Sequence, residues 1–256
     1  MKIPALPAAA LLVLCAHCAH AGVQLTDEQA REIGNRIWKN ECAGTVSGLT
    51  TWNKGEEFPS LGIAHFIWYP KGVRGPFEES FPGLVKYLES RRIQVPAWLN
   101  GPAPWNTRSE FQADLDSPRM KTLRTLLQNT IPEQARYAAM RLENALPKML
   151  AAAPASQREK IRENFNRVAA QRLGLYALMD YVNFKGEGTS PSERYKGRGW
   201  GLLQVLETMP TSGPALPEFA AAADKVLTER VKNSPPARNE AKWLTGWRNR
   251  LATYTR

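Results

Sequence analysis

Cysteine and histidine are scarce in this sequence. The 256 residues include 3 of each, and two of each lie within the first 20 positions. The rest of the chain holds only Cys42 and His65, which excludes an internal disulfide and a Cys/His zinc cluster there. A serine or cysteine nucleophile would have to use His65 as its base. With 24 acidic residues available, the composition favours carboxylate chemistry instead.

Long hydrophobic runs are also missing after the first 21 residues. Lys2, the apolar run at 8–16 and the small-x-small sequence at 19–21 are typical of a signal peptide that is cleaved before Gly22. The apolar run is too short to span a bilayer. We therefore expect a periplasmic or secreted protein without a transmembrane segment in its mature chain.

No long block of Lys or Arg occurs, although the formal net charge is +10. A basic protein favours an anionic partner. Because the basic residues are scattered and export is expected, we predict peptidoglycan glycan strands as that partner and no binding of nucleic acid. The hydrophobic content of 43% is enough for a folded core. We expect a monomer that needs no metal and no cofactor.

The pattern along the chain is mainly helical, with one stretch of strand and turn residues. Residues 26–29 (Thr-Asp-Glu-Gln) form a capping box, which predicts a helix to about Asn40. Glycine-punctuated β-type residues at 41–69 predict short strands, and the proline-rich stretch 70–108 indicates loops. The remaining pattern predicts helices over the ranges 109–129, 132–150, 157–182, 200–208, 217–232 and 238–254.

This order of elements indicates an α+β fold that is mainly helical, with a small antiparallel sheet after the first helix. We expect a single domain over 22–256, because the length suits one large domain or one domain with a sizeable insertion. The stretch at about 70–170 is the predicted insertion.

Glu41 is the most informative position for chemistry. At about 100° per residue it falls on the same helix stripe as Ile33 and Ile37. A carboxyl at the end of a core-facing stripe is partly desolvated, which raises its pKa and lets it donate a proton to a leaving oxygen. The alternative is that the helix ends before Glu41 and leaves its side chain in water.

A predicted hairpin follows Glu41, because a glycine-containing turn separates two β-type stretches. It carries Glu56, Glu57, Ser60 and His65. A glycosidase needs a second polar group across the scissile bond, and Glu56, Glu57 or Asn53 is a candidate, with Ser60 positioning a water. The alternatives are a solvated acidic turn and a structural histidine.

A glycine-rich, basic and aromatic stretch occupies residues 185–200. Glycine permits the backbone to approach a ligand closely. In and beside this stretch, Asn183 and Trp200 are candidates for contacts with sugar, and Arg198 for a contact with a carboxylate. Tyr181 is a further sugar-binding candidate, and Glu187 a further candidate for the second carboxylate. The alternative is a flexible connector.

Four stretches together resemble the phage-type lysozymes, or endolysins. In chain order they are Glu41 followed by the hairpin sequence Ser-Leu-Gly-Ile-Ala-His at 60–65, Ala-Leu-Met-Asp-Tyr at 177–181 with Gly-Glu-Gly at 186–188, Gly-Leu-Leu-Gln-Val-Leu at 201–206, and Leu-Thr-Gly-Trp-Arg-Asn-Arg at 244–250. The resemblance covers roughly half of the mature chain. It implies a lysozyme-like fold and cleavage of the β-1,4 glycan of peptidoglycan, with Glu41 as general acid.

Several features of the sequence depart from this family, including the position of Asn183, which is displaced by one residue from the family Asn. Lys54 stands where the family has its hairpin aspartate, and Ala64 replaces a glycine. If the second carboxylate is missing, the lytic transglycosylases are the better model, since they use one Glu as acid and then as base. The sequence Gly-Leu-Leu-Gln at 201–204, which contains the candidate substrate-binding residue Gln204, is similar to one of their elements. A third reading is a wall-binding protein that has lost catalysis.

Overall fold

The computed structural model describes residues 25–75, 77–191 and 193–256. The predicted signal peptide at 1–21 lies outside the described residues. Its helices, with their bounds, are α1 (Asp27–Cys42), α2 (Phe81–Ser90), α3 (Arg108–Ala113), α4 (Pro118–Asn129), α5 (Ile131–Ala152), α6 (Arg158–Ala169), α7 (Gly174–Lys185), α8 (Leu202–Thr208), α9 (Ala215–Asn233) and α10 (Ala241–Leu251). Its strands are β1 (Thr50–Thr51), β2 (Ser60–Leu61), β3 (Phe66–Ile67), β4 (Arg194–Tyr195) and β5 (Arg198–Gly199).

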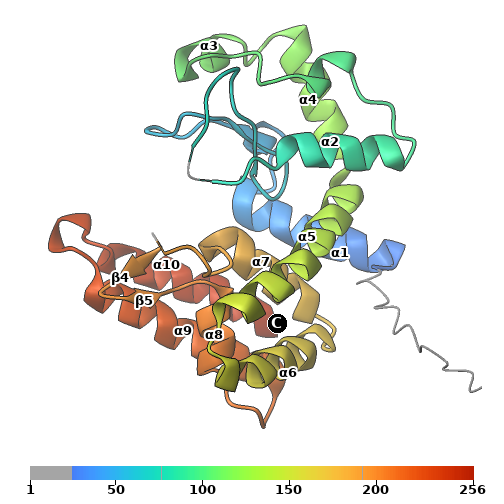
Figure 1. Ribbon diagram of the computed structural model, residues 1–256. Helices are drawn as coiled ribbons and strands as arrows, with labels where there is room; N and C mark the ends of the chain where they lie inside the picture. The colour runs from blue at the N-terminus through green and yellow to red at the C-terminus, as the bar shows by residue number, and fades with distance from the viewer. Residues whose placement is uncertain (1–24, 76, 192) are drawn as a thin grey trace, which may run out of the picture.

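The elements form two lobes (Figure 1). The sheet lobe contains β1–β3 and α2–α4, and the helical lobe contains α6–α10 with the β4–β5 hairpin. The long helix α5 runs from one lobe to the other, and α1 packs along it. One continuous cluster of buried hydrophobic residues extends from Leu25 to Tyr254 and passes through both lobes.

The predicted small antiparallel sheet after the first helix is confirmed. Its strands pair in the order β1–β2–β3, with Thr50 opposite Leu61 and Leu61 opposite Phe66. The turn after β2 lies directly against α5, since a Cβ at Gly62 would lie 2.3 Å from the Gln134 side chain of that helix. The Gln134 oxygen accepts a hydrogen bond from the Ile63 amide (2.9 Å), which fixes the sheet against α5.

Two predicted helices are wrong in that each is broken in the structure. The range 109–129 divides into α3 and α4, because Ser117 caps a new helix that begins at Pro118. The range 157–182 divides into α6 and α7. At that second break a Cβ on Gly174 would lie 1.7 Å from the Val168 oxygen, so the chain turns too closely there for a continuous helix.

The stretch 70–108 contains a helix where loops were predicted. In α2, Pro82 occupies the first turn, where its missing amide hydrogen has no helical partner to lose. The helix buries Phe81, Leu84, Val85 and Leu88. The predicted insertion at 70–170 spans α2 to α6 and includes α5, the helix against which α1 packs.

No helix in the described part of the chain is long and apolar enough to cross a membrane.

Candidate functional site

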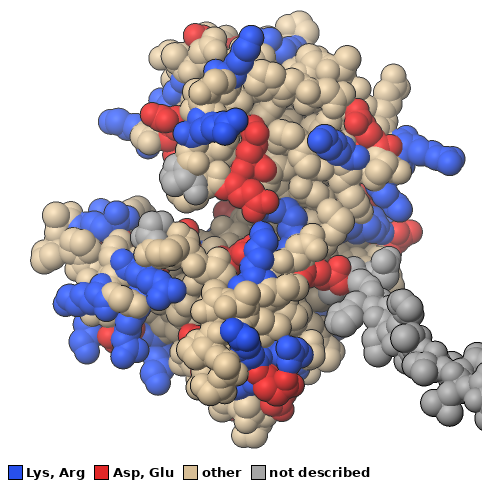
Figure 2. All heavy atoms as spheres, viewed as in Figure 1, with Lys and Arg blue, Asp and Glu red and all other residues tan. Residues whose placement is uncertain are grey.

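A notch separates the two lobes on the left of the view in Figure 2. The C-terminal end of α1 lies at the inner end of this notch (Figures 1 and 2). The loop that carries Glu78 and the turn that carries Glu187 are on opposite lobes, and Lys148 of α5 lies 3.7 Å and 3.9 Å from their carboxylates. Lys148 therefore links the two lobes through one charged contact with each.

Glu41 lies at this end of α1, on the stripe through which the helix packs on α5. Ile33 and Ile37 on the stripe are buried, and a Cβ at Gly34 would lie 2.7 Å from Ile131. The Glu41 side chain is 12% exposed. As the helix pattern predicts, this carboxyl is partly buried rather than free in water.

Three segments that are distant in the sequence contact the Glu41 carboxylate. The amide of Asn183, from α7, donates to Oε1 at 2.8 Å. The Arg250 guanidinium, from α10, donates to the same oxygen. His65, which follows β2, places its Nδ1 3.6 Å from Oε2. Within the described residues Oε2 accepts no hydrogen bond, so one carboxylate oxygen is fixed and the other faces only the His65 ring.

A buried aspartate holds Arg250 in place. The Arg250 Nε donates to Asp180 Oδ2 at 2.7 Å, and its Nη2 donates to Oδ1 at 2.9 Å. Asp180 is fully buried and also accepts hydrogen bonds from Tyr254 (2.7 Å) and Asn40 (3.1 Å). This network fixes the guanidinium that faces Glu41.

The predicted rise in the pKa of Glu41 is wrong. Burial does raise the pKa of this carboxyl, but the positive charge of Arg250 acts in the opposite direction. The neighbouring His65 and the hydrogen bonds from Arg250 and Asn183 add to this effect, and the pKa of Glu41 is lowered overall. Glu41 is therefore ionised in the free protein at neutral pH.

Of the hairpin candidates, only His65 contacts Glu41. Ser60 is buried in β2. Glu57 is exposed, and the carboxylate of Glu56 accepts a hydrogen bond from Asn53 within the same turn (3.2 Å). In the part of the chain that is described, neither glutamate pairs with Glu41. The predicted second carboxylate is therefore not in contact with the first.

His65 itself has an uncommon backbone conformation. Its φ is 48°, in the left-handed region that residues other than glycine seldom adopt. Its Nε2 is buried and has no hydrogen-bond partner among the described residues. The backbone holds this ring beside Glu41 at a cost in conformational energy, which is a feature of functional sites.

The predicted sugar contacts of Tyr181 and Trp200 are wrong. Tyr181 is fully buried and donates a hydrogen bond from its hydroxyl to the Trp200 carbonyl (2.9 Å). Trp200 is 8% exposed, with the Arg230 guanidinium 4.1 Å from its ring centroid and the Tyr195 ring 4.6 Å away. The protein itself covers these aromatic rings, so no surface remains for a sugar.

The other candidates on the helical lobe have different environments. Gln204 accepts a hydrogen bond from the Gly201 amide (3.0 Å) and donates one to the Gly188 carbonyl (3.1 Å), so its side chain fixes the local turn. Glu187 is half-buried beside Lys148. Arg198 is exposed and lines a pocket of about 520 Å³.

The sequence reasoning missed Asp180 and Arg250 as site residues. Both stand inside stretches that carry the lysozyme resemblance, at 177–181 and 244–250. Asp180 lies on a helix that is otherwise largely apolar, and a lone carboxylate on such a helix requires a buried cation. That signal was available in the sequence, although it could not identify Arg250 among the many basic residues.

Lys185, the last residue of α7, lies between two aromatic rings. Its Nζ lies 3.6 Å from the ring centroid of Trp247 and 3.9 Å from that of Phe184. Burial, together with the positive charge of Arg230, lowers the pKa of Lys185 to about 7. This lysine is therefore close to the point at which it loses its charge at neutral pH.

Comparison with known proteins gives no match to a family model, to a curated protein or to a solved structure. Within residues 25–75, 77–191 and 193–256, no group of three or more His, Cys, Asp or Glu side chains is placed to hold a metal ion. The chemical interpretation therefore depends on the geometry around Glu41.

Proposed function

We propose that this protein is an exported enzyme of lysozyme-like fold that cleaves the β-1,4 glycan backbone of peptidoglycan, with Glu41 as the acid–base group. One observation carries the proposal. The Glu41 carboxylate, near the C-terminal end of α1, has Oε1 held by Asn183 and Arg250 and Oε2 free of hydrogen bonds from the described residues. A carboxylate held in one orientation is what glycoside cleavage requires of its acid–base group, and the notch between the lobes is the place proposed for the glycan.

The ionised state of Glu41 defines how the cycle must begin. A glycan that fills the notch removes water from Oε2, and desolvation raises the pKa of a carboxyl. Glu41 then takes up a proton and donates it to the glycosidic oxygen. The carboxylate that remains stabilises the positive charge developing on the sugar ring. A water molecule then adds to the anomeric carbon and gives its proton to Glu41, which loses it again when the product leaves and water returns to the notch.

A second candidate function is lytic transglycosylation. It is favoured by the partners of Glu41, which in the described residues are an amide, a guanidinium and an imidazole but no other carboxylate. The nearby Asp180 is saturated by Arg250 and Tyr254. One glutamate acting first as acid and then as base is sufficient when a hydroxyl of the sugar itself attacks.

The test is Glu41→Gln, assayed by release of soluble fragments from purified peptidoglycan sacculi. Glutamine retains the shape and the hydrogen-bonding capacity of Oε1 but cannot transfer the proton. We expect activity to fall by about 10²–10⁴-fold, with unchanged circular dichroism and unchanged binding to sacculi. The matched control is Glu28→Gln, which changes an exposed glutamate in the first turn of the same helix.

The products separate the candidate functions. Reducing muramic ends support hydrolysis, and anhydro-muramic ends support transglycosylation. Binding of the unmodified protein to sacculi without release of any fragment would instead support a non-catalytic wall-binding protein. Full activity of Glu41→Gln would remove Glu41 from the mechanism and contradict the proposal.

A further inference from the structure

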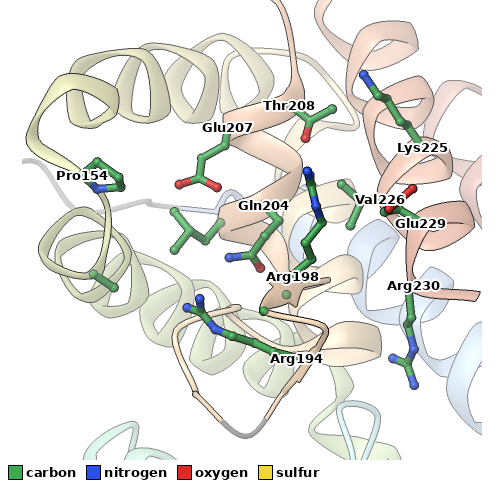
Figure 3. Close-up of a pocket in the computed structure, with 14 residues that line it drawn as sticks. Pro154, Arg194, Arg198, Gln204, Glu207, Thr208, Lys225, Val226, Glu229 and Arg230 are labelled. Carbon is green, nitrogen blue, oxygen red and sulfur yellow. The ribbon is translucent and has the colours of Figure 1, made fainter. Parts of the chain in front are cut away.

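A pocket of about 520 Å³ lies in the helical lobe (Figure 3). Its walls are the link after α5, the β4–β5 hairpin, α8 and α9. Glu41 and its partners Asn183, His65 and Arg250 are not among the residues that line it. The volume is within the range of pockets that bind small ligands.

The pocket contains charges of both signs. Arg194 and Arg198 of the hairpin line it, and Lys225 lines it from α9. In the described part of the chain none of these three cations forms an ion pair, in contrast to Arg230, which is paired with Glu240. Figure 3 shows the Arg198 side chain extending between α8 and α9 and Arg230 directed away from the other cations.

Two carboxylates line the same pocket. Glu207 is on α8, half-buried, and Figure 3 shows its side chain directed toward the wall that carries Pro154. Burial raises the pKa of Glu207, and the charge of Arg194 acts in the opposite direction. Glu229 is on α9, where one of its oxygens accepts a hydrogen bond from Asn233 (3.0 Å). An anionic ligand alone would bring a further negative charge beside both carboxylates.

The walls of the pocket are fixed by close packing. A Cβ at Gly199 would lie 2.8 Å from the Gln204 side chain, so the hairpin lies directly against α8. Gln204 is held in turn by Gly188 and Gly201. Leu203 and Val226 supply apolar surface between the charged groups. The charged groups are therefore presented at set positions, which lowers the entropic cost of binding a ligand.

We propose that this pocket binds a short peptide that carries both carboxylates and a free amine, and that this peptide is the one that branches from the muramic acid of peptidoglycan. The identity of the peptide rests on the proposed function. Arg194, Arg198 and Lys225 pair with the peptide carboxylates, and Glu207 receives the amine. A peptide containing D-glutamate and a diamino acid has both kinds of group.

The pocket thus gives the enzyme a second point of attachment. The glycan occupies the notch, and a peptide on the same or a neighbouring strand occupies the helical lobe. Two linked contacts bind a polymer more tightly than either contact alone when both can be made at once. The enzyme would then prefer glycan that carries uncapped peptides with a free amine.

The test is isothermal titration calorimetry of the whole protein with the tripeptide L-alanyl-γ-D-glutamyl-meso-diaminopimelic acid. We expect binding that is weakened about tenfold or more by Arg198→Ala. Acetylation of the diaminopimelate amine should weaken binding to the unmodified protein but have no further effect on Glu207→Gln, because the amine has then lost its partner. The matched control is Lys232→Ala, which removes an exposed cation from the same helix as Lys225.

Several outcomes would overturn the inference. They are no measurable binding of the tripeptide, binding that Arg198→Ala leaves unchanged, equal binding of the acetylated peptide, and displacement of the peptide by inorganic phosphate at the same concentration. Because the titration needs no cleavage, it can be repeated on Glu41→Gln. Loss of peptide binding would refute this inference alone, whereas activity of Glu41→Gln would refute the proposed function alone.

Discussion

Two clusters in or beside the helical lobe each pair a buried arginine with carboxylates. They differ in whether every carboxylate oxygen accepts a hydrogen bond from the protein. In the first, Arg250 bridges Asp180 and Glu41. In the second, Arg230 binds Glu240, whose side chain is 3% exposed. Both arginines are also largely buried, at 15% and 13% exposed. Burial alone therefore does not distinguish the two clusters.

The second cluster is closed. Oε1 of Glu240 accepts from Tyr195, Arg230 and Arg238, and Oε2 accepts from the Arg230 Nε (2.7 Å). The Arg230 guanidinium also lies over the ring of Trp200. Each charge in this cluster has its partner within the protein, which is how buried ion pairs stabilise a fold rather than serve a ligand.

In the first cluster only one of the two carboxylates has all its oxygens hydrogen-bonded within the described part of the protein. Asp180 is saturated, but Glu41 has one oxygen that receives no hydrogen bond from the described residues and faces His65 at 3.6 Å. The contrast teaches that the number of partners, rather than the depth of burial, indicates which carboxylate is available for chemistry. Three predictions test this contrast.

The largest effect is expected for Asp180→Asn. The substitution keeps the size of the side chain but leaves Arg250 with Glu41 as its only anionic partner. We expect the free energy of unfolding to fall by about 3–5 kcal/mol, measured by urea denaturation at pH 7. The control is Asp224→Asn, which breaks the exposed pair with Arg248 and should cost less than about 1 kcal/mol. Equal effects of the two variants would contradict the assignment of Asp180 as the anchor.

The closed cluster should control stability in acid. The pKa of Glu240 is lowered to about 2, against the burial that raises it, by hydrogen bonds from Arg230 and Tyr195 and by the charge of Arg230. A carboxyl whose pKa is lower in the folded state stabilises the fold above its unfolded pKa, and this contribution disappears as the pH falls towards 2.

We therefore expect the free energy of unfolding to decline between about pH 5 and pH 2, with about 3 kcal/mol of the decline due to Glu240. In Glu240→Gln this component should be missing at every pH. Urea denaturation at pH 3, 5 and 7 measures it, and Glu159→Gln, which changes an exposed pair with Arg162, is the control. An unchanged acid dependence in Glu240→Gln would show that other carboxylates cause the decline.

The smallest effect is expected at the open end of the first cluster. Asn183→Ala removes one hydrogen bond from Glu41 Oε1, which stabilises the ionised form by about 1 kcal/mol. The pKa of Glu41 should therefore rise. The measurement is a ¹³C NMR titration of the Glu41 carboxyl, assigned with Glu41→Gln. The upper limb of the pH–activity profile should move in the same direction. Asn35→Ala, an exposed change on α1, should move neither quantity.

The sequence was informative wherever a local pattern determined the outcome. The capping box at Thr26 is present as predicted, and α1 continues to Cys42, with Glu41 on its buried stripe. The short strands after α1 follow from the spacing of glycine and β-type residues. The breaks before Pro118 and Gly174 were missed, because the helical periodicity of each stretch concealed its turn residues.

The properties that depend on distant contacts were not predictable. Glu41 was identified from its helix, but the direction of its pKa is determined by Arg250, which belongs to another helix. Tyr181 and Trp200 are next to a glycine-rich stretch that suggested exposure, yet tertiary packing buries both. A pattern of residue types shows that a group is polar or aromatic, and only the fold shows what lies against it.

The separation of Glu41 and Arg250 by 209 residues has a consequence for the timing of biogenesis. Synthesis delivers a chain from its N-terminal side, so the helix that holds Glu41 emerges long before Arg250. During that interval the glutamate remains solvated, with an ordinary affinity for protons and no fixed orientation. The arrangement around Glu41 is complete only once α10 has folded, so the first helix and the last must both be in place before this cluster exists.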